Sequence, residues 1–175
     1  MEIVRSVIDF FNHPFFIIVG GLATLLSVVG FLYIIYLVVK GIMPVWYRLG
    51  IGLSRKKIAI FAAEEFDNLR SMLVDSNIFA EKNIVKIDKQ SIKKAQSISL
   101  LLVHWKAFEA DIDNILGIKN DSDALIIYAP KNEGLIDDKN LEKIDRERNS
   151  IIVNFRGRLL NDILTSMITT GYEKR

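Results

Sequence analysis

The segment with the clearest potential for chemistry is Asn154-Phe155-Arg156-Gly157-Arg158. It ends an apolar run, carries two guanidinium groups, and includes a glycine that lets a ligand approach the backbone closely. A helix that begins here would add its unpaired N–H groups and the positive end of its dipole, and together these groups suit a phosphate or another anion. The pattern predicts an anion or nucleotide site formed by Asn154, Arg156, Gly157 and Arg158.

The same arginines have a structural alternative. They could pair with Glu64, Glu65 or Asp162 and fasten the edge of a sheet without binding a ligand. Both roles remain open at the level of the sequence.

His104 and Trp105 follow another apolar run and complete the candidate ligand-binding set. A histidine can act as an acid or a base near neutral pH, and the neighbouring indole could stack on a substrate ring. The alternative for His104 is a structural hydrogen-bonding role at a strand end. Glu64 and Glu65 also follow a strand, but glutamate is favoured at a helix start by the dipole, so we interpret them as capping residues.

Several classes of chemistry are disfavoured by what the chain lacks. It has no cysteine, which excludes disulfides, thiolate zinc sites and a cysteine nucleophile, and its two histidines leave little material for a metal centre. The motifs GxGxxG after the first apolar run, GxSxG and HExxH are missing, as is a phosphate-binding GxxxxGK loop. We therefore expect no metal, no cofactor and no catalytic residue. A net charge of +2 offers no basic face for nucleic acid, so direct nucleic-acid binding is not expected.

From residue 57 onward, short apolar runs alternate with helical stretches, which predicts an α/β domain with a mostly parallel sheet at residues 57–175. The five expected strands are 57–61, 83–87, 98–103, 124–128 and 150–155, and the expected helices are 64–73, 91–96, 108–116, 140–148 and 158–170, with Gly117 and Gly171 as helix stops. Right-handed crossovers favour the flavodoxin-like strand order 2-1-3-4-5, and ligands bind beyond the carboxyl ends of such strands.

Residues 15–39 carry no charge, and a helix of these 25 residues would span about 37 Å. That length exceeds the roughly 30 Å hydrocarbon core of a bilayer and allows tilt. A secretory signal would have a shorter apolar region, and a soluble core helix of this length would be unusual. We predict a single transmembrane helix at residues 14–40 and a juxtamembrane linker at residues 41–56.

Residues 1–13 are predicted to form an interfacial amphipathic helix. Its apolar face would hold Ile3, Val4, Val7, Ile8 and Phe11, opposite Glu2, Arg5, Ser6 and Asp9. Asn12 is expected to cap the next helix, with Pro14 in its first turn.

Basic residues flank the apolar segment unequally. Lys40, Arg48, Arg55, Lys56 and Lys57 follow it, whereas Arg5 alone precedes it. The positive-inside rule then places the C-terminal domain in the cytoplasm, and Trp46 and Tyr47 fit an aromatic belt at that interface. The expected location is the cell inner membrane, crossed once, with the lipid bilayer as the first partner.

Gly20, Ala23, Ser27 and Gly30 lie within about 80° of arc on a helix of 3.6 residues per turn, and Gly41 continues the line. Small residues on one stripe let helices approach closely, so this stripe predicts a homo-oligomer contact. The alternative is that small residues are simply frequent in membrane helices.

Residues 57–175 resemble the small Rossmann-type or TIR-like sensing domains of membrane-anchored bacterial immunity proteins. The likeness is carried by Asp123-Ala124-Leu125-Ile126-Ile127-Tyr128-Ala129-Pro130 and by Asn154-Phe155-Arg156-Gly157-Arg158, together with the layout of an anchor before a compact domain. The resemblance implies a membrane-disrupting or signalling effector of an anti-phage system. It assigns no activity to single residues, because the glutamate of TIR-type NAD cleavage is not recognisable. The chain also departs from phosphoacceptor receiver domains, since Ala62-Ala63-Glu64-Glu65 stands where paired acids would be.

Three functions are therefore compatible with the sequence. The first is a non-enzymatic membrane effector whose cytoplasmic domain receives a nucleotide or protein signal. The second is a membrane-tethered enzyme that acts on a nucleotide or nucleoside at the edge formed by His104 and Arg156. The third is a module that docks a cytoplasmic protein partner. The stripe favours the first function, and the missing motifs count against the second.

The topology can be tested with reporter fusions. Because basic residues crowd the C-terminal flank, a phosphatase fused after Arg175 should remain inactive in the cytoplasm, and a fluorescent protein fused there should be bright. An active C-terminal phosphatase would reverse the predicted orientation.

Overall fold

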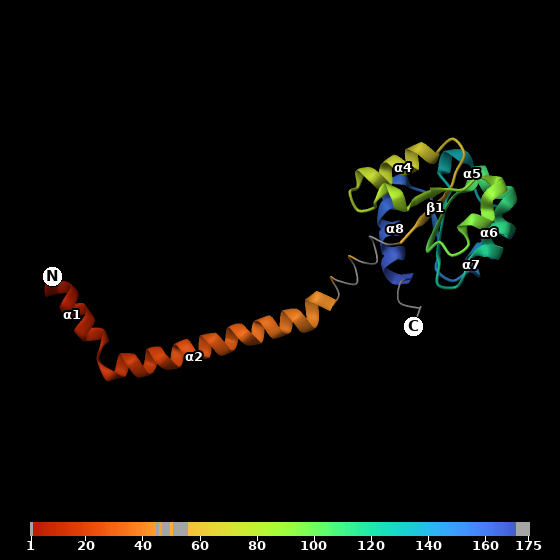
Figure 1. The fold of residues 1–175 in the computed structure, drawn as a ribbon. Coiled ribbons are helices and arrows are strands. Elements are labelled where there is room, and N and C mark those ends of the chain that lie inside the picture. Colours follow the sequence, from red (N-terminus) through yellow and green to blue (C-terminus); the bar gives the residue numbers. More distant parts are fainter. Residues whose placement is uncertain (1, 45, 47–49, 51–55, 171–175) are drawn as a thin grey trace. The chain divides into compact units, whose positions relative to one another are not determined.

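The structure is a computed structural model that describes residues 2–44, 46, 50 and 56–170 (Figure 1). The chain divides into two compact units, residues 1–48 and residues 49–175, and each is described by itself.

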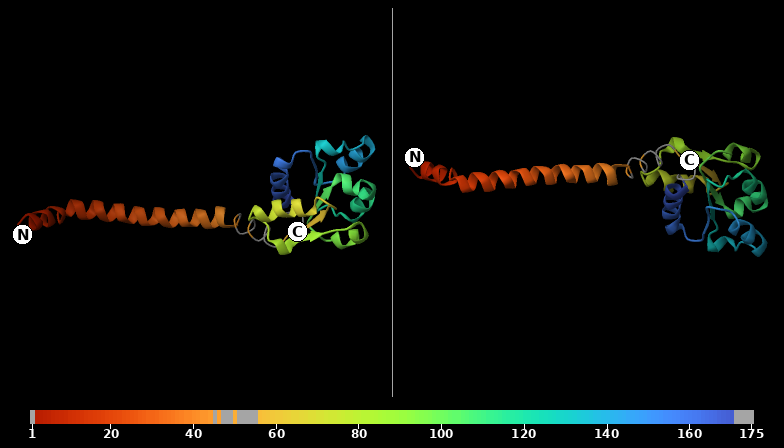
Figure 2. Two further views of the ribbon diagram at one scale, coloured as in Figure 1. Left: turned by 90° about the horizontal axis from the view of Figure 1, so that it is seen from above. Right: turned by 90° about the horizontal axis from the view of Figure 1, so that it is seen from below.

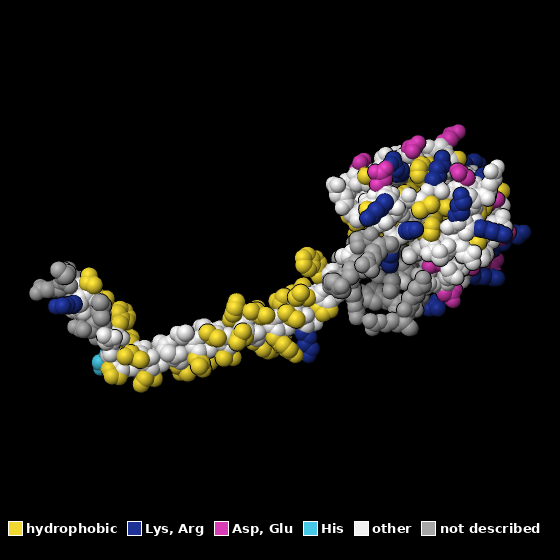
Figure 3. Space-filling model, viewed as in Figure 1, with side chains coloured by type: hydrophobic (Ala, Val, Ile, Leu, Met, Phe, Trp, Pro, Cys, Tyr) yellow, Lys and Arg dark blue, Asp and Glu magenta, His cyan; other side chains and the backbone are white. Residues whose placement is uncertain are grey.

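The N-terminal unit consists of α1 (Glu2–Phe11) and α2 (Pro14–Leu37), and α2 continues without a break into the π-helix η1 (Val38–Ile42). Residues Pro14–Ile42 form one helix that is long and apolar enough to cross a membrane, and none of its residues is buried by other parts of the protein. Hydrophobic side chains cover the visible face of this helix (Figure 3). The helix continues two residues past Lys40, into the start of the segment predicted as a linker.

The turn between α1 and α2 is built from aromatic side chains. The ring of Phe16 lies 4.9 Å from that of Phe10 and 5.5 Å from that of Phe11. His13, rather than the predicted Asn12, caps α2, and its Nδ1 accepts a hydrogen bond of 3.3 Å from the Phe15 N–H. Pro14 occupies the start of the helix, as predicted, because its missing N–H costs nothing there.

The C-terminal unit contains one sheet of five parallel strands in the order β2-β1-β3-β4-β5, which confirms the predicted flavodoxin-like arrangement. The strands are β1 (Ile58–Phe61), β2 (Ile84–Lys86), β3 (Leu100–His104), β4 (Ala124–Tyr128) and β5 (Ser150–Val153). Every residue of β1, β3 and β4 is buried, which explains their continuous apolar sequence: helices cover both faces of the sheet (Figure 2).

The connections contain five α-helices and four 3-10 segments among the described residues of this unit. The α-helices are α4 (Phe66–Asp75), α5 (Trp105–Phe108), α6 (Ile112–Ile118), α7 (Asp138–Asp145) and α8 (Arg156–Thr169). The 3-10 segments are η2 (Glu81–Asn83), η3 (Lys89–Ala95), η4 (Glu109–Asp111) and η5 (Lys131–Glu133).

Several predicted boundaries were wrong. The expected helix at 91–96 is the 3-10 segment η3, and the expected helix at 108–116 is divided among α5, η4 and α6, with Gly117 inside α6 instead of ending it. Helix α8 begins at Arg156, two residues before the predicted start at residue 158. Strand β5 is therefore shorter than predicted, and Gly157 and Arg158 lie in the first helical turn. The predicted stop at Gly171 lies outside the described residues.

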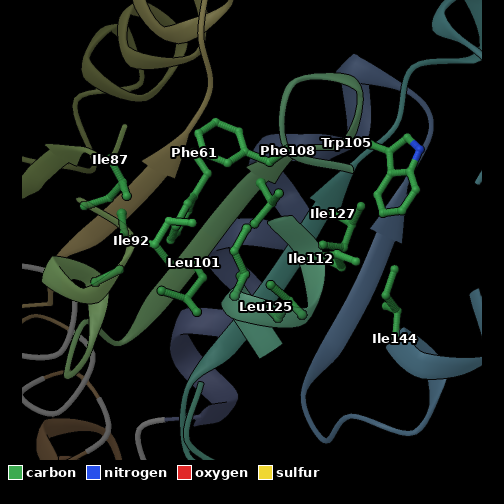
Figure 4. Packing of buried hydrophobic residues seen from close by; sticks show 14 of the residues in the cluster. Phe61, Ile87, Ile92, Leu101, Trp105, Phe108, Ile112, Leu125, Ile127 and Ile144 are labelled. Atoms are coloured by element: carbon green, nitrogen blue, oxygen red, sulfur yellow. The ribbon is translucent and has the colours of Figure 1, made fainter. Parts of the chain in front are cut away.

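Two hydrophobic layers hold the sheet between its helices. One layer joins alternate strand residues to α4 and α8 through Leu69, Leu73, Leu159 and Ile163. The other joins the opposite face to η3, α5, α6 and α7. In this second layer the rings of Phe61 and Phe108 meet edge to face at 5.6 Å (Figure 4). Because both layers are complete within the domain, the sheet presents polar side chains only where its strands end.

Candidate ligand site at the carboxyl edge of the sheet

After β1 and after β3, the chain passes to opposite faces of the sheet. After β1 it enters α4, on one face, and returns as β2; after β3 it enters α5 and α6, on the other face, and returns as β4. In parallel sheets with this arrangement, the divergence between neighbouring strands leaves a crevice beyond their carboxyl ends, and ligands bind there. The residues at this position are therefore the first to consider.

His104 is the last residue of β3. In the three buried strands β1, β3 and β4, His104 and Tyr128 are the two polar residues. Strand alternation puts it on the same face as Leu100 and Leu102, which is the face covered by α4 and α8. The imidazole is only 6% exposed. Its Nε2 lies 2.9 Å from Glu133 Oε2, but the two groups are not aligned as a hydrogen bond, so Nε2 has no hydrogen-bond partner among the described residues.

Tyr128 ends β4 and is the register partner of His104. The two rings are 5.9 Å apart and inclined by 41°. Burial raises the pKa of the Tyr128 phenol; the Arg156 guanidinium opposes this shift, and the carboxylates of Glu65 and Glu133 add to it. Three charged groups from three different connections therefore act on one phenol group.

Arg156 closes the site from the start of α8. Its guanidinium donates to Asn68 Oδ1, and also to the Asn68 carbonyl at 3.4 Å, and lies 3.9 Å from Glu65 Oε2. Asn68 in turn donates to Glu65 at 2.9 Å. The Arg156 side chain remains 43% exposed, so one side of it still faces solvent.

Arg158 lies 3.9 Å from Asp162 within α8, and its side chain is largely exposed. The pairs with Glu65 and Asp162 are those of the structural alternative considered for these arginines. A surface ion pair of this kind contributes little to stability and leaves a guanidinium able to change partners. Anion binding by Arg156 and Arg158 stays a prediction.

The other predicted site residues are dispersed. Asn154 is exposed in the connection from β5 to α8. Gly157 has no atom within 4 Å of the position that a Cβ would take, so its own surroundings do not require glycine. Trp105 is 4% exposed and packs into the hydrophobic layer on the opposite face from His104, near Ile127 and Ile144 (Figure 4). The structure therefore brings His104 and Arg156 toward one edge and does not bring the Trp105 ring to it.

Three residues of the site were not foreseen: Tyr128, Glu133 and Asn68. Tyr128 could have been found, because it is the polar final residue of a strand that is otherwise aliphatic. Glu133 lies in η5, within the stretch that reads only as a polar loop, and Asn68 lies on an exposed turn of α4. Neither carries a signal in the sequence.

The assembled edge offers a cation, two carboxylates, a phenol and a buried imidazole. This set suits a ligand with both hydrogen-bond donors and an anionic group, since a purely anionic ligand would be repelled by Glu65 and Glu133. Among the residues that the structure describes, no three histidine or acidic side chains converge as a metal site would require.

Comparisons of the chain with protein-family models, with curated proteins and with solved structures returned no match. The likeness to TIR-like defence domains therefore remains an expectation drawn from the sequence.

The raised pKa of Tyr128 gives a test of this geometry, which can be made on the domain alone. Residues 56–175 are chosen because they keep the hydrogen bond that Lys56 donates to the Met167 carbonyl. Tyr172 is the only other tyrosine in these residues, so Tyr172→Phe leaves a single phenol to titrate by its absorbance. The midpoint should lie above about 10, the ordinary value for tyrosine. Above that pH the unfolded chain loses its proton before the folded domain does, so the free energy of unfolding should fall as pH rises, and Tyr128→Phe should remove this fall.

Charge variants separate the causes. Arg156→Gln should move the Tyr128 midpoint upward, and Glu133→Gln should move it downward. A midpoint at or below 10 in the parent domain would show that the phenol is not held in this environment.

Proposed function

We propose that this protein is a membrane-anchored effector or signalling protein of the anti-phage defence type, whose α/β domain receives a nucleotide or protein signal and whose anchor acts at the membrane. The observation that supports it most directly is the buried imidazole of His104, which lies with the Glu133 carboxylate at the edge where this sheet topology accepts ligands. Arg156, whose side chain is 43% exposed and whose charge acts on Tyr128, supplies a cation for an anionic group.

The anchor in this proposal is the helix Pro14–Ile42, inserted in the cell inner membrane with the domain in the cytoplasm. Lys40, near its C-terminal end, donates to the Tyr36 hydroxyl at 3.2 Å and lies 5.5 Å from the centre of that ring. An amphipathic pair of this kind is typical of the interface between hydrocarbon and headgroups. It supports an end of the span near this residue.

We further propose that anchors associate through the stripe of Gly20, Ala23, Ser27 and Gly30. The hydroxyl of Ser27 donates to the Ala23 carbonyl at 2.8 Å, so it enters a helix contact with its own hydrogen bond already satisfied. No side chain shields Gly20 or Gly30, and a second helix could approach both closely. Association of anchors would connect a signal at the domain to a change in the bilayer.

A second function, a membrane-tethered enzyme acting on a nucleotide or nucleoside, is favoured by one contact. Glu133 Oε2 lies 2.9 Å from His104 Nε2, and a carboxylate beside a buried imidazole can orient it for proton transfer. In this reading Tyr128 would be the neighbouring hydrogen-bonding group.

The ligand can be sought by a thermal-shift screen of residues 56–175 against mono-, di- and cyclic nucleotides. If a phosphate binds at the start of α8, Arg156→Ala and Arg158→Ala should each remove a charge-assisted hydrogen bond worth roughly 1.5 to 3 kcal/mol, or about 10- to 150-fold in affinity. Chromatography of the incubated nucleotide distinguishes the two functions, because only an enzyme would convert it and His104→Gln should then stop the conversion.

Arg146→Ala is the matched control, since Arg146 pairs with Glu142 one helical turn away, as Arg158 does with Asp162. It should leave nucleotide affinity unchanged. A wild-type domain that no nucleotide stabilises, together with Arg156→Ala and Arg158→Ala domains that melt several degrees lower, would reduce this edge to a structural role.

The action at the membrane can be measured with a potential-sensitive dye in expressing bacteria. Strong expression favours association of anchors by mass action, so the full chain should depolarise the membrane and a chain lacking residues 1–39 should not. Gly20→Ile combined with Ser27→Ile should suppress depolarisation and crosslinked oligomers, because bulky side chains hold the helix backbones apart.

Leu25→Ile combined with Leu32→Ile places the same side chains on the opposite face and should preserve both signals. Equal depolarisation by the full chain and the shortened chain would contradict the effector function.

A further inference from the structure

The sheet edge at β2 is rich in lysine. The contiguous segment Glu81–Ala95, which comprises η2, β2 and η3 and is called the β2 edge below, contains five lysines and two acids. The five lysines are Lys82, Lys86, Lys89, Lys93 and Lys94, and all are exposed. In η3, Ile92 and Ala95 are buried in the core, so the intervening Lys93 and Lys94 are held outward.

Few of these charges are matched by acids on the domain. Glu81 is already paired with Arg70, and Lys89 lies 3.9 Å from Asp111. Lys82, Lys93 and Lys94 form no ion pair with any residue that the structure describes. These three lysines of the β2 edge are therefore left without an acidic partner among the described residues.

The other side of the sheet has the opposite charge. Residues 119–147, which lead from the end of α6 through β4 to just past α7, contain eight acids and five bases. This gives −3, against five minus two, or +3, for the β2 edge, while the chain as a whole carries only +2. The strand order places β1 and β3 between β2 and β4, so these two segments lie apart along the sheet.

On the basis of the proposed insertion of Pro14–Ile42 in the membrane, we infer that the β2 edge docks on anionic lipid headgroups of the same bilayer. Only 15 residues, 43–57, separate Ile42 from β1, and fully extended they reach about 50 Å, so the domain is confined near the membrane surface at a high effective concentration. Clustered lysines near an anionic leaflet contribute about 1 kcal/mol each, and the acidic side of the sheet is repelled from it. The docked domain stands with β2 toward the lipid and β5 toward the cytoplasm.

Protection against edge-to-edge aggregation is a known reason for lysines on an edge strand. It accounts for Lys86 in β2. It does not account for Lys93 and Lys94, which lie in η3 and outside β2.

The test uses the full chain in lipid nanodiscs. Because the chain has no cysteine, Gln90→Cys on the β2 edge or Lys139→Cys on α7 gives a single dye position, and energy transfer to acceptor-labelled headgroups reports how close each side of the sheet is to the lipid. Energy transfer from position 90 should be stronger in discs with 30% phosphatidylglycerol than in pure phosphatidylcholine. In the anionic discs it should also exceed the transfer from position 139. Both differences should disappear in 1 M salt, where screening is nearly complete.

Lys93→Gln combined with Lys94→Gln should lower the ratio of docked to undocked domain about thirty-fold. Lys139→Gln combined with Lys143→Gln removes the same charge from α7 and should leave the ratio unchanged or raise it. Equal transfer from position 90 in neutral and anionic discs, or equal losses from the two double variants, would overturn the inference. Capture of the β2 edge by a short DNA duplex in preference to the anionic disc would make it a nucleic-acid surface and would overturn it as well.

Discussion

The burial of both faces of the sheet is the constraint on which the domain depends. Every residue of β1, β3 and β4 is withdrawn from water, so helices must cover both sides, and the connections between parallel strands must be crossovers long enough to provide them. Polar chemistry is thereby confined to the strand ends. His104 and Tyr128 mark that limit: both sit at the last position of a buried strand, where the hydrophobic layer gives way to Glu133, Glu65 and Arg156.

The same constraint explains which parts of the fold could be predicted. Apolar runs such as Ala124–Tyr128 can be recognised as strands in the sequence because burial on two faces disfavours polar residues within them. The right-handed crossover rule then leaves few possible strand orders. Helix limits were harder. Phe108 and Asp111 depart from helical backbone geometry between α5 and α6, and their residue types do not predict this break. His13 rather than Asn12 caps α2 because the cap is decided by which side chain reaches the Phe15 N–H.

The candidate site was predictable only in part, for a physical reason. His104 could be placed because it ends β3, and Arg156 because it follows β5 at the start of α8; strand ends of a parallel sheet share one edge. Trp105 is the next residue after His104, yet the chain turns into α5 there and carries the indole to the opposite face, where it packs in the core. Glu133 and Asn68 reach the edge from η5 and α4, and their approach depends on how these segments pack against the sheet, which spacing along the chain does not encode.

The π-helix at Val38–Ile42 has a consequence for how two anchors would meet. A π-turn holds one residue more than an α-turn, so the helix phase downstream of it is shifted by up to about 100°. Gly41 lies within η1, so the 3.6-residue repeat that would align it with Gly20 and Gly30 no longer applies at its position. A close seam between two anchors would consequently run from Gly20 to Gly30 and end there, and Tyr33, Tyr36 and Lys40 would lie beyond its end. Paired anchors would be joined along the N-terminal part of the helix and splayed along its C-terminal part.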